Sequence, residues 1–344
     1  MKVLFIGGTG NISTAVSRLT VERGIDLYLL NRGTRPVTVE GAHGLVADIK
    51  DPKSTQAALE GHEWDAVVNW IAFTTPDVER DLALFAGKTR QYIFISSASV
   101  YQKPLAHPVV TESTPLVNPY WQYSRDKIAC EERLTRAYRD EGFPITIVRP
   151  SLTYETVLPV AIGGWNDYTI VDRMKRGEPV VVHGDGTSLW TVTHSRDFAK
   201  GFVGLLGHQQ ALGHAFHITS DELLTWDQIY RAVGAAAGVE AKIVHIASEF
   251  IVKVARELGQ GWMEGNLLGD KAASVIFDNT KIKRFVPEFT ATIPFAAGIR
   301  ETVRWFEEKP ERMTIKQGNN DLIDALLAAY ARVSSTDAEV GASA

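Results

Sequence analysis

The chain has 344 residues, of which 45% are hydrophobic and 22% are charged, as is typical of a globular protein with one large domain or two smaller ones. Its formal net charge of −5 argues against a nucleic acid partner, because a polyanion is bound chiefly by excess lysine and arginine. The single cysteine, Cys130, excludes an internal disulfide, and no apolar run is long enough to span a bilayer. The nine histidines lack the spacing of metal ligands. We therefore expect a cytoplasmic protein with no metal site and no membrane partner.

A glycine-rich turn stands at the start of the chain. Residues 2–6 form an apolar run typical of a buried strand, and Gly7-Gly8-Thr9-Gly10-Asn11-Ile12-Ser13 leads from it into a helical pattern. Glycines let a backbone approach a pyrophosphate closely, and the free N–H groups at the start of a helix favour its negative charge. The order of strand, glycine turn and helix predicts a dinucleotide site with these contacts: Gly7, Thr9, Gly10, Asn11 and Ile12.

Short apolar segments alternate with helical patterns over residues 1–150. The predicted strands cover residues 2–6, 25–30, 44–47, 65–69, 92–95 and 145–148, and the predicted helices cover 15–23, 53–59, 77–86 and 120–139. Strands that alternate with helices predict a parallel sheet with right-handed crossovers. The expected fold class is therefore α/β, with a doubly wound parallel sheet in a first domain over residues 1–150.

The alternation becomes less regular after residue 150. Helices are expected at 171–176, 197–206, 226–237, 249–258 and 293–307, and strands at 179–182 and 215–219. We expect residues 151–333 to form a smaller, mixed α/β substrate domain that returns parts of the sheet to the first domain. A last helix is expected at 321–332, followed by a disordered tail over 334–344.

Ser97, Tyr123 and Lys127 are the candidate catalytic residues. Tyr123 and Lys127 are four positions apart in a helical pattern, so they share one face of the helix. A free tyrosine has a pKa near 10, and an ammonium group together with an oxidised nicotinamide would lower it. Such a trio can exchange a proton with an alcohol while a hydride passes to or from a cofactor. On spacing alone the Tyr-x-x-x-Lys pair is weak evidence, because it also occurs on solvated helix faces.

Further motifs follow in order along the chain. They are Asp48 after the third strand, Ser97-Ala98-Ser99-Val100-Tyr101, Tyr123-Ser124-Arg125-Asp126-Lys127 and Arg149-Pro150. Together with the glycine turn, they resemble the extended short-chain dehydrogenase/reductase family, the family of NAD-dependent epimerases and dehydratases. Gly184-Asp185-Gly186-Thr187 and His194-Ser195-Arg196-Asp197-Phe198-Ala199 are similar to motifs of its second half. The resemblance covers roughly residues 1–310 and implies a Rossmann domain.

The resemblance implies a role for each candidate residue. Ser97 would polarise the substrate, Tyr123 would be the acid and base, and Lys127 would hold the nicotinamide ribose and lower the pKa of the tyrosine. Besides Tyr123 and Lys127, the implied contacts of the cofactor beyond the glycine turn are Asn31, Arg32, Asp48, Ile49, Ile71, Ala72 and Pro150.

The end of the second strand bears on the choice of cofactor. It carries Asn31 and Arg32 where an NAD-preferring relative would have an acidic residue for the ribose 2′-OH. Since an arginine accommodates a 2′-phosphate, NADP is favoured. The alternative is that Arg32 stacks on the adenine and NAD binds as well. The resemblance also implies that the helices at 77–86 and 120–139 pair across a homodimer.

The substrate side departs from the family's pattern. Relatives that act on sugar nucleotides have arginines where this chain has Trp190 and Leu268. Their absence argues against a nucleotide-linked substrate, because phosphates are bound by charge-assisted hydrogen bonds. Trp190 either stacks on a sugar ring or packs in the core. The expected substrate contacts are Phe73, Ser99, Tyr154 and Trp190.

These features predict an NAD(P)-dependent oxidoreductase or epimerase that transfers a hydride at a secondary alcohol or ketone of a sugar or sugar-like small molecule. A nucleotide-sugar 4-epimerase is one alternative. An RNA-binding protein is another, because chloroplast stem-loop-binding relatives share Asp270-Lys271-Ala272-Ala273 and Phe277-Asp278. The third is a cofactor-sensing protein without turnover. The acidic charge balance argues against RNA binding, and the retained Tyr123 argues against a sensor.

Overall fold

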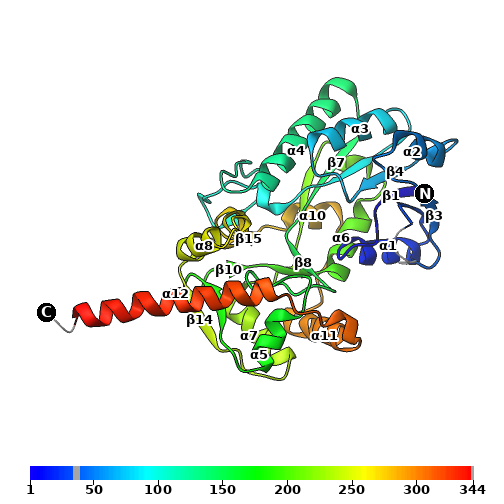
Figure 1. The fold of residues 1–344 in the computed structure, drawn as a ribbon. Coiled ribbons are helices and arrows are strands. Elements are labelled where there is room, and N and C mark those ends of the chain that lie inside the picture. The colour runs from blue at the N-terminus through cyan, green and yellow to red at the C-terminus, as the bar shows by residue number, and fades with distance from the viewer. Residues whose placement is uncertain (34–38, 342–344) are drawn as a thin grey trace.

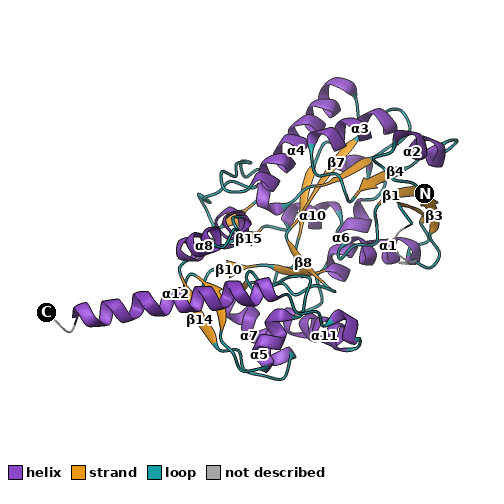
Figure 2. Ribbon diagram, in the orientation of Figure 1, coloured by secondary structure: helices purple, strands orange, loops and turns teal. Residues whose placement is uncertain are grey.

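The structure is a computed structural model that describes residues 1–33 and 39–341. A seven-stranded parallel sheet organises its first half (Figures 1 and 2). The strands lie in the order β12 (Ala215–Ile218), β7 (Ile145–Pro150), β5 (Tyr92–Ile95), β4 (Ala66–Asn69), β1 (Lys2–Ile6), β2 (Asp26–Asn31) and β3 (His43–Val46). The predicted fold class is confirmed. The order of the strands reverses beside β1, which pairs with β2 on one side and β4 on the other, and ligands of such sheets bind at the carboxyl ends of the strands at this point.

Helices cover both faces of this sheet (Figure 1). On one face lie α1 (Ser13–Glu22) and α6 (Ser195–Leu205), and on the other lie α2 (Pro52–Leu59), α3 (Thr75–Phe85) and α4 (Gln122–Glu141). Along β1, Val3 and Phe5 pack toward α1 and α6, whereas Leu4 and Ile6 pack toward α3 and α4. All four side chains are fully buried. Because successive strand residues point to opposite faces, only a continuous apolar run suits a strand covered on both sides.

The second half combines helices with pairs of short strands around its own apolar core. The strand pairs are β8 (Leu152–Tyr154) with β11 (Val192–His194), β9 (Val180–His183) with β14 (Ile243–Ile246), β10 (Leu189–Trp190) with β13 (Leu224–Thr225), and β6 (Val109–Val110) with β15 (Ile276–Phe277). The helices are α5 (Thr169–Lys175), α7 (Trp226–Ala236), α8 (Ser248–Glu257), α9 (Trp262–Asn266), α10 (Thr280–Phe285) and α11 (Phe295–Glu307). Single helical turns lie at Ala98–Val100, Gln209–Ala211, Leu267–Lys271 and Pro310–Arg312.

The last helix differs from its predicted bounds. Instead of covering residues 321–332, α12 runs over Gln317–Gly341 and projects from the body of the molecule (Figure 1). Its sequence contains no proline, and no glycine between Gly318 and Gly341, so nothing in the chain breaks the helix where the tail was expected to start. Residues 342–344 of that expected tail lie outside the described part. Within the described ranges, no helix has the length and apolar character that a bilayer crossing requires.

A buried ion pair joins α4 to the sheet. Arg149 on β7 donates from Nε and Nη2 to the two carboxylate oxygens of Glu131, at 2.9 and 2.6 Å. The side chains are 5% and 4% exposed, so both charges depend on each other for compensation. This pair holds the helix that carries Tyr123 and Lys127 against the strand that ends at Pro150.

We expect Glu131→Ala to lower the free energy of unfolding by about 3–5 kcal/mol, because the guanidinium of Arg149 would remain buried without its partner. The matched variant Glu132→Ala removes the carboxylate of an exposed neighbour and should change the free energy of unfolding by less than about 0.5 kcal/mol. Urea unfolding followed by circular dichroism measures both. Equal effects of the two substitutions would show that the pair does not stabilise this helix.

Candidate functional site

The glycine turn after β1 has the shape of a phosphate cradle. Gly7 and Gly8 have φ angles of +90° and +100°, which favour glycine. A Cβ on Gly8 would lie 2.8 Å from Cδ2 of Leu29, so a side chain at this position would also have to displace the side chain of Leu29 on the neighbouring strand. The turn leads directly into α1, and Ser13 Oγ accepts a hydrogen bond of 2.8 Å from the backbone N–H of Gly10. The residues therefore fit a dinucleotide pyrophosphate at the start of this helix.

Two asparagines predicted as cofactor contacts use their side chains to shape this turn. Asn11 Nδ2 donates to the carbonyl of Thr153 at 3.0 Å, and its Oδ1 accepts from the N–H of Thr156 at 3.3 Å. The Asn31 amide, in the orientation that satisfies its hydrogen bonds, donates to the carbonyl of Gly7 at 3.0 Å. The Asn11 side chain thus connects the turn to β8 and to the loop that follows it. The Asn31 side chain connects the turn to β2.

The ends of β1, β2, β3, β4 and β7 place the other predicted cofactor contacts on the same edge of the sheet. Ile6, the last residue of β1, lies beside Leu30 on β2 and Asn69 on β4. Residues just beyond these ends therefore line one edge. Thr9 and Ile12 are half-buried there, Arg32 and Ile71 are exposed, Asp48 is half-buried, and Ile49, Ala72 and Pro150 are buried.

Lys127 connects two of these strand ends. Its ammonium donates to the carbonyl oxygens of Ala72 and Ile95, both at 2.7 Å, and the side chain is 2% exposed. Its Nζ lies 4.5 Å from the ring centroid of Phe73 and 5.8 Å from that of Tyr123. Burial lowers the pKa of Lys127 to about 8. The lysine thus lies beside the tyrosine and is held by main-chain carbonyls.

The pKa of Tyr123 departs from the prediction. Burial raises it from 10.0 to about 12, and the hydrogen bond with the hydroxyl of Ser97 acts in the opposite direction. The negative charge of Asp270 raises it further. The expected lowering by Lys127 is not observed in the protein alone, because the ammonium is directed at the two carbonyls and the cost of burying a phenolate exceeds its influence.

A chain of hydroxyl groups supports Ser97. Its Oγ lies 2.9 Å from Oγ of Ser99, which in turn accepts a hydrogen bond of 2.7 Å from Ser124 Oγ. Ser99 is 2% exposed, so its hydroxyl lies behind Ser97 and not at an accessible surface as expected for a substrate contact. Sequence reasoning missed Ser124, although it directly follows Tyr123 and lies within one helical turn of Lys127.

The other predicted substrate contacts separate into two groups. Phe73 is 45% exposed and its ring lies 6.4 Å from that of Tyr123, so it is well placed beside the candidate catalytic residues. Trp190 is 1% exposed and packs against Trp226 at 5.7 Å between ring centroids, which agrees with the core-packing alternative. Tyr154 is fully buried, with its ring 5.1 Å from that of His194. Trp190 and Tyr154 thus belong to the core of the second half, because its short strands bury both.

Asn118, which sequence reasoning also missed, connects the two halves beside the candidate catalytic residues. Its Nδ2 donates to the carbonyls of Ser99 at 2.8 Å and Gly269 at 2.7 Å. Its Oδ1 accepts from the N–H groups of Tyr120 and Trp121, each at 3.1 Å. This buried amide fixes the loop before Tyr123. The signal available in the sequence was an asparagine just before the helix, a position that suits backbone capping.

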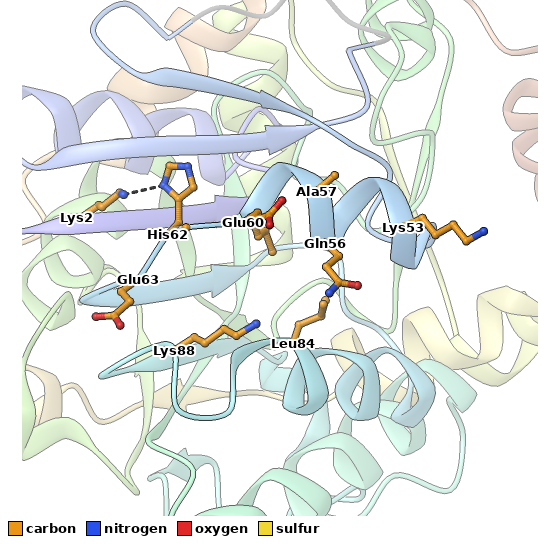
Figure 3. Close-up of a pocket in the computed structure, with 11 residues that line it drawn as sticks. Lys2, Lys53, Gln56, Ala57, Glu60, His62, Glu63, Leu84 and Lys88 are labelled. Carbon is orange, nitrogen blue, oxygen red and sulfur yellow. Dashed lines mark hydrogen bonds between the residues drawn. The ribbon is translucent and has the colours of Figure 1, made fainter.

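Two pockets lie on different sides of the glycine turn. A pocket of about 430 Å³ borders the start of α1, and its lining includes Gly10, Asn11 and His194. A pocket of about 900 Å³ lies between α2 and the end of α3 (Figure 3), where Lys2 Nζ is 2.7 Å from His62 Nδ1. Lys2 begins β1, whereas the glycine turn follows its other end, so this larger pocket lies away from the predicted chemistry.

Comparisons with known proteins agree with this geometry. The family model described as the NAD dependent epimerase/dehydratase family matches residues 3–219. A chloroplast stem-loop binding protein of 41 kDa from Arabidopsis thaliana is 28% identical over 259 residues, which cover 71% of this chain and 65% of that protein. A 2′-dehydrokanamycin reductase from Streptomyces kanamyceticus is 25% identical over 251 residues, which cover 73% of this chain and 70% of that enzyme. The match therefore spans slightly less than two thirds of the first relative and slightly more of the second.

Solved structures share the fold. A UDP-glucose 4-epimerase from Bifidobacterium longum, in complex with NAD+ and UDP, aligns with a TM-score of 0.71 at 19% identity and covers 91% of this chain and 100% of its own. The epimerase Mth375 from Methanothermobacter thermautotrophicus aligns with a TM-score of 0.73 at 16% identity and covers 90% of this chain and 93% of its own. At these identities the likeness concerns the fold alone.

The raised pKa of Tyr123 can be measured directly. In protein labelled with 13Cζ-tyrosine, the Tyr123 signal, assigned by its loss in Tyr123→Phe, should stay at the neutral-phenol position up to about pH 11. Ser97→Ala should move its midpoint upward, because the Ser97 hydroxyl lowers this pKa. Since the phenol ionises first in the unfolded chain, its contribution to stability is present below the ordinary pKa of 10.0 and is lost toward 12. A midpoint below 10.0 in the protein alone would contradict the dominance of burial.

Proposed function

Because the chain belongs to the NAD-dependent epimerase/dehydratase family, we propose that it is an NAD(P)-dependent oxidoreductase or epimerase that acts on a sugar or sugar-like small molecule that is not nucleotide-linked. The observation that carries this proposal is the convergence of Ser97, Tyr123 and Lys127 at the carboxyl ends of β4 and β5, beside the glycine turn. The pairing of α3 and α4 across a homodimer stays a prediction.

Each of the three side chains has a defined part in the proposed reaction. A bound nicotinamide would supply the hydride donor or acceptor. With its pKa near 12, the Tyr123 phenol is protonated at neutral pH and can donate its proton to a carbonyl oxygen of the substrate. Ser97 holds the same oxygen by a hydrogen bond and is itself oriented by Ser99. In the oxidative direction the phenol must first lose its proton, which the positive charges of Lys127 and of an oxidised nicotinamide favour.

We expect Tyr123→Phe to lower turnover by roughly 100-fold or more, because it removes the group that transfers the proton. The matched variant Tyr138→Phe removes the hydroxyl of an exposed tyrosine on the same helix and should leave turnover unchanged. Nicotinamide absorbance, followed across free sugars, sugar acids and polyols, identifies a substrate and then compares the variants. Unchanged turnover of Tyr123→Phe on that substrate would show that another group is the acid and base.

NADP is the proposed cofactor. Arg32 is exposed just after β2, at the edge of the sheet where the glycine turn begins, and no acidic residue stands at the last position of β2, which is Asn31. An arginine suits a 2′-phosphate, whereas a carboxylate there would repel it. Asn31 is engaged with the carbonyl of Gly7, whereas the exposed Arg32 can present its guanidinium to the adenosine.

Arg32→Ala should weaken NADPH binding by about tenfold, the value of one charge-assisted hydrogen bond, and should leave NADH binding nearly unchanged. The control Arg23→Ala removes an exposed arginine at the far end of α1 and should alter neither affinity. Fluorescence titration with NADPH and with NADH measures the ratio of the two affinities in each variant. If Arg32→Ala weakens both nucleotides equally, Arg32 stacks on the adenine and NAD is as good a cofactor.

RNA binding is the second candidate, and the 28% identity to a chloroplast stem-loop binding protein favours it. The net charge of −5 opposes it, since counterion release by lysine and arginine dominates such binding. Tight binding of a stem-loop RNA that weakens steeply with salt, without turnover in the sugar screen, would support this second candidate against the enzyme.

A further inference from the structure

A buried cluster of charges lies beside Tyr123 and has no part in the reaction described above. It consists of Lys103, Asp270 and Lys271. Lys103 is 4% exposed, and its Nζ donates to the backbone carbonyl of Asp270 at 3.0 Å. Lys271 Nζ donates to the carboxylate of Asp270 at 2.8 Å and to Oδ1 of Asn266 at 2.9 Å. Lys271 is thus paired with the one carboxylate of the cluster, whereas Lys103 has only a carbonyl as hydrogen-bond partner, so with both lysines charged the cluster carries a net charge of +1.

The cluster is fixed close to the candidate catalytic residues. The charge of Asp270 reaches the phenol of Tyr123 and raises its pKa. Through Asn118, the backbone of Gly269 is tied to that of Ser99. A Cβ on Gly269 would lie 3.1 Å from Cβ of Trp121, so the turn Leu267–Lys271 packs directly on the residues that precede Tyr123.

The uncompensated charge is costly as it stands. A buried ammonium needs hydrogen-bond acceptors and an opposite charge, and a carbonyl oxygen supplies only the first. Burial is the main cause that lowers the pKa of Lys103; the charge of Asp270 acts in the opposite direction, and that of Lys271 lowers the pKa further. Within residues 1–33 and 39–341, no ion pair involves Lys103. Its Nζ lies 5.8 Å from the ring centroid of Trp190. An anion bound here would compensate the charge.

We propose that Lys103 and Lys271 bind a small anionic group of the substrate, a carboxylate or a phosphate monoester, next to Tyr123. This inference rests on the proposed function and adds the chemical class of the substrate. A net charge of +1 suits a single anionic group, the carboxylate of a sugar acid or a phosphate monoester, better than the more highly charged diphosphate of a nucleotide. It also agrees with the absence of arginines at Trp190 and Leu268, since the charge for recognition comes from other positions.

Binding can be tested separately from turnover. In full-length Tyr123→Phe, with and without NADP+, isothermal titration would compare glucose, galactose and mannose with their uronates and their 6-phosphates, and with UDP. We expect at least one acid to bind roughly 10- to 100-fold more tightly than its parent sugar, the range for a charge-assisted hydrogen bond in a buried site. Preference for uronates or for phosphates identifies which anion is bound.

Lys103→Gln and Lys271→Gln, introduced into the same protein, should each reduce this preference toward unity. The control Lys283→Gln also removes one positive charge, but from an exposed residue paired with Asp221, and should keep the preference. The result is expressed as the affinity for the acid divided by the affinity for its neutral sugar, so a general loss of affinity cancels. If circular dichroism shows that Lys103→Gln does not fold, Lys271→Gln decides.

Several results would overturn the inference. They are equal binding of acids and neutral sugars, no binding of any acid, tighter binding of UDP than of every uronate and 6-phosphate, and a preference that survives in both lysine variants. None of these bears on the acid and base role of Tyr123, which the turnover of Tyr123→Phe tests. Conversely, loss of the preference in the lysine variants would support the inference even if the turnover experiment fails.

Discussion

The hydrogen bonds from the Lys127 ammonium to the carbonyls of Ala72 and Ile95 are the interaction on which the site depends. They join the carboxyl ends of two adjacent parallel strands to the helix that carries Tyr123. Ile95 is the last residue of β5 and Ala72 lies in the loop after β4, so the lysine satisfies carbonyl groups at the carboxyl edge of the sheet. The tyrosine is then positioned by the helix, and Ser97 by the next turn of the chain, so the three groups converge without a flexible loop between them.

Local patterns in the sequence were sufficient for the sheet and for the position of the chemistry. The apolar run of β1, the positive-φ glycines after it and the four-residue spacing of Tyr123 and Lys127 each depend on near neighbours in the chain, and the structure places all of them on one edge of the sheet. Ser99, Trp190 and Tyr154 were expected as substrate contacts from their positions in the family's sequence pattern. Their burial depends on contacts across the fold, with Ser124, Trp226 and His194, which no local pattern reports.

The pKa of Tyr123 likewise depends on contacts that no local sequence pattern reports. The sequence shows that a lysine lies near a tyrosine, but it does not show where the ammonium is directed or how deeply the phenol is buried. With the pKa of Tyr123 near 12, the protein alone holds the phenol protonated. The balance between proton donation and proton acceptance at this residue is thus set by what binds beside it, since any added positive charge favours the phenolate.

The side chains of Asn118 and Asn11 each connect the first half of the chain to the second, which limits how the two halves can move. Asn118 joins the loop at Ser99 to the turn at Gly269, and Asn11 joins the first turn of the chain to the segment after β8. Separating the two halves at either point would break these hydrogen bonds, each of which contributes about 0.5–1.5 kcal/mol. A wide hinge motion between the two halves is thereby disfavoured, and we expect ligands to bind and leave while Asn11 and Asn118 keep their hydrogen bonds.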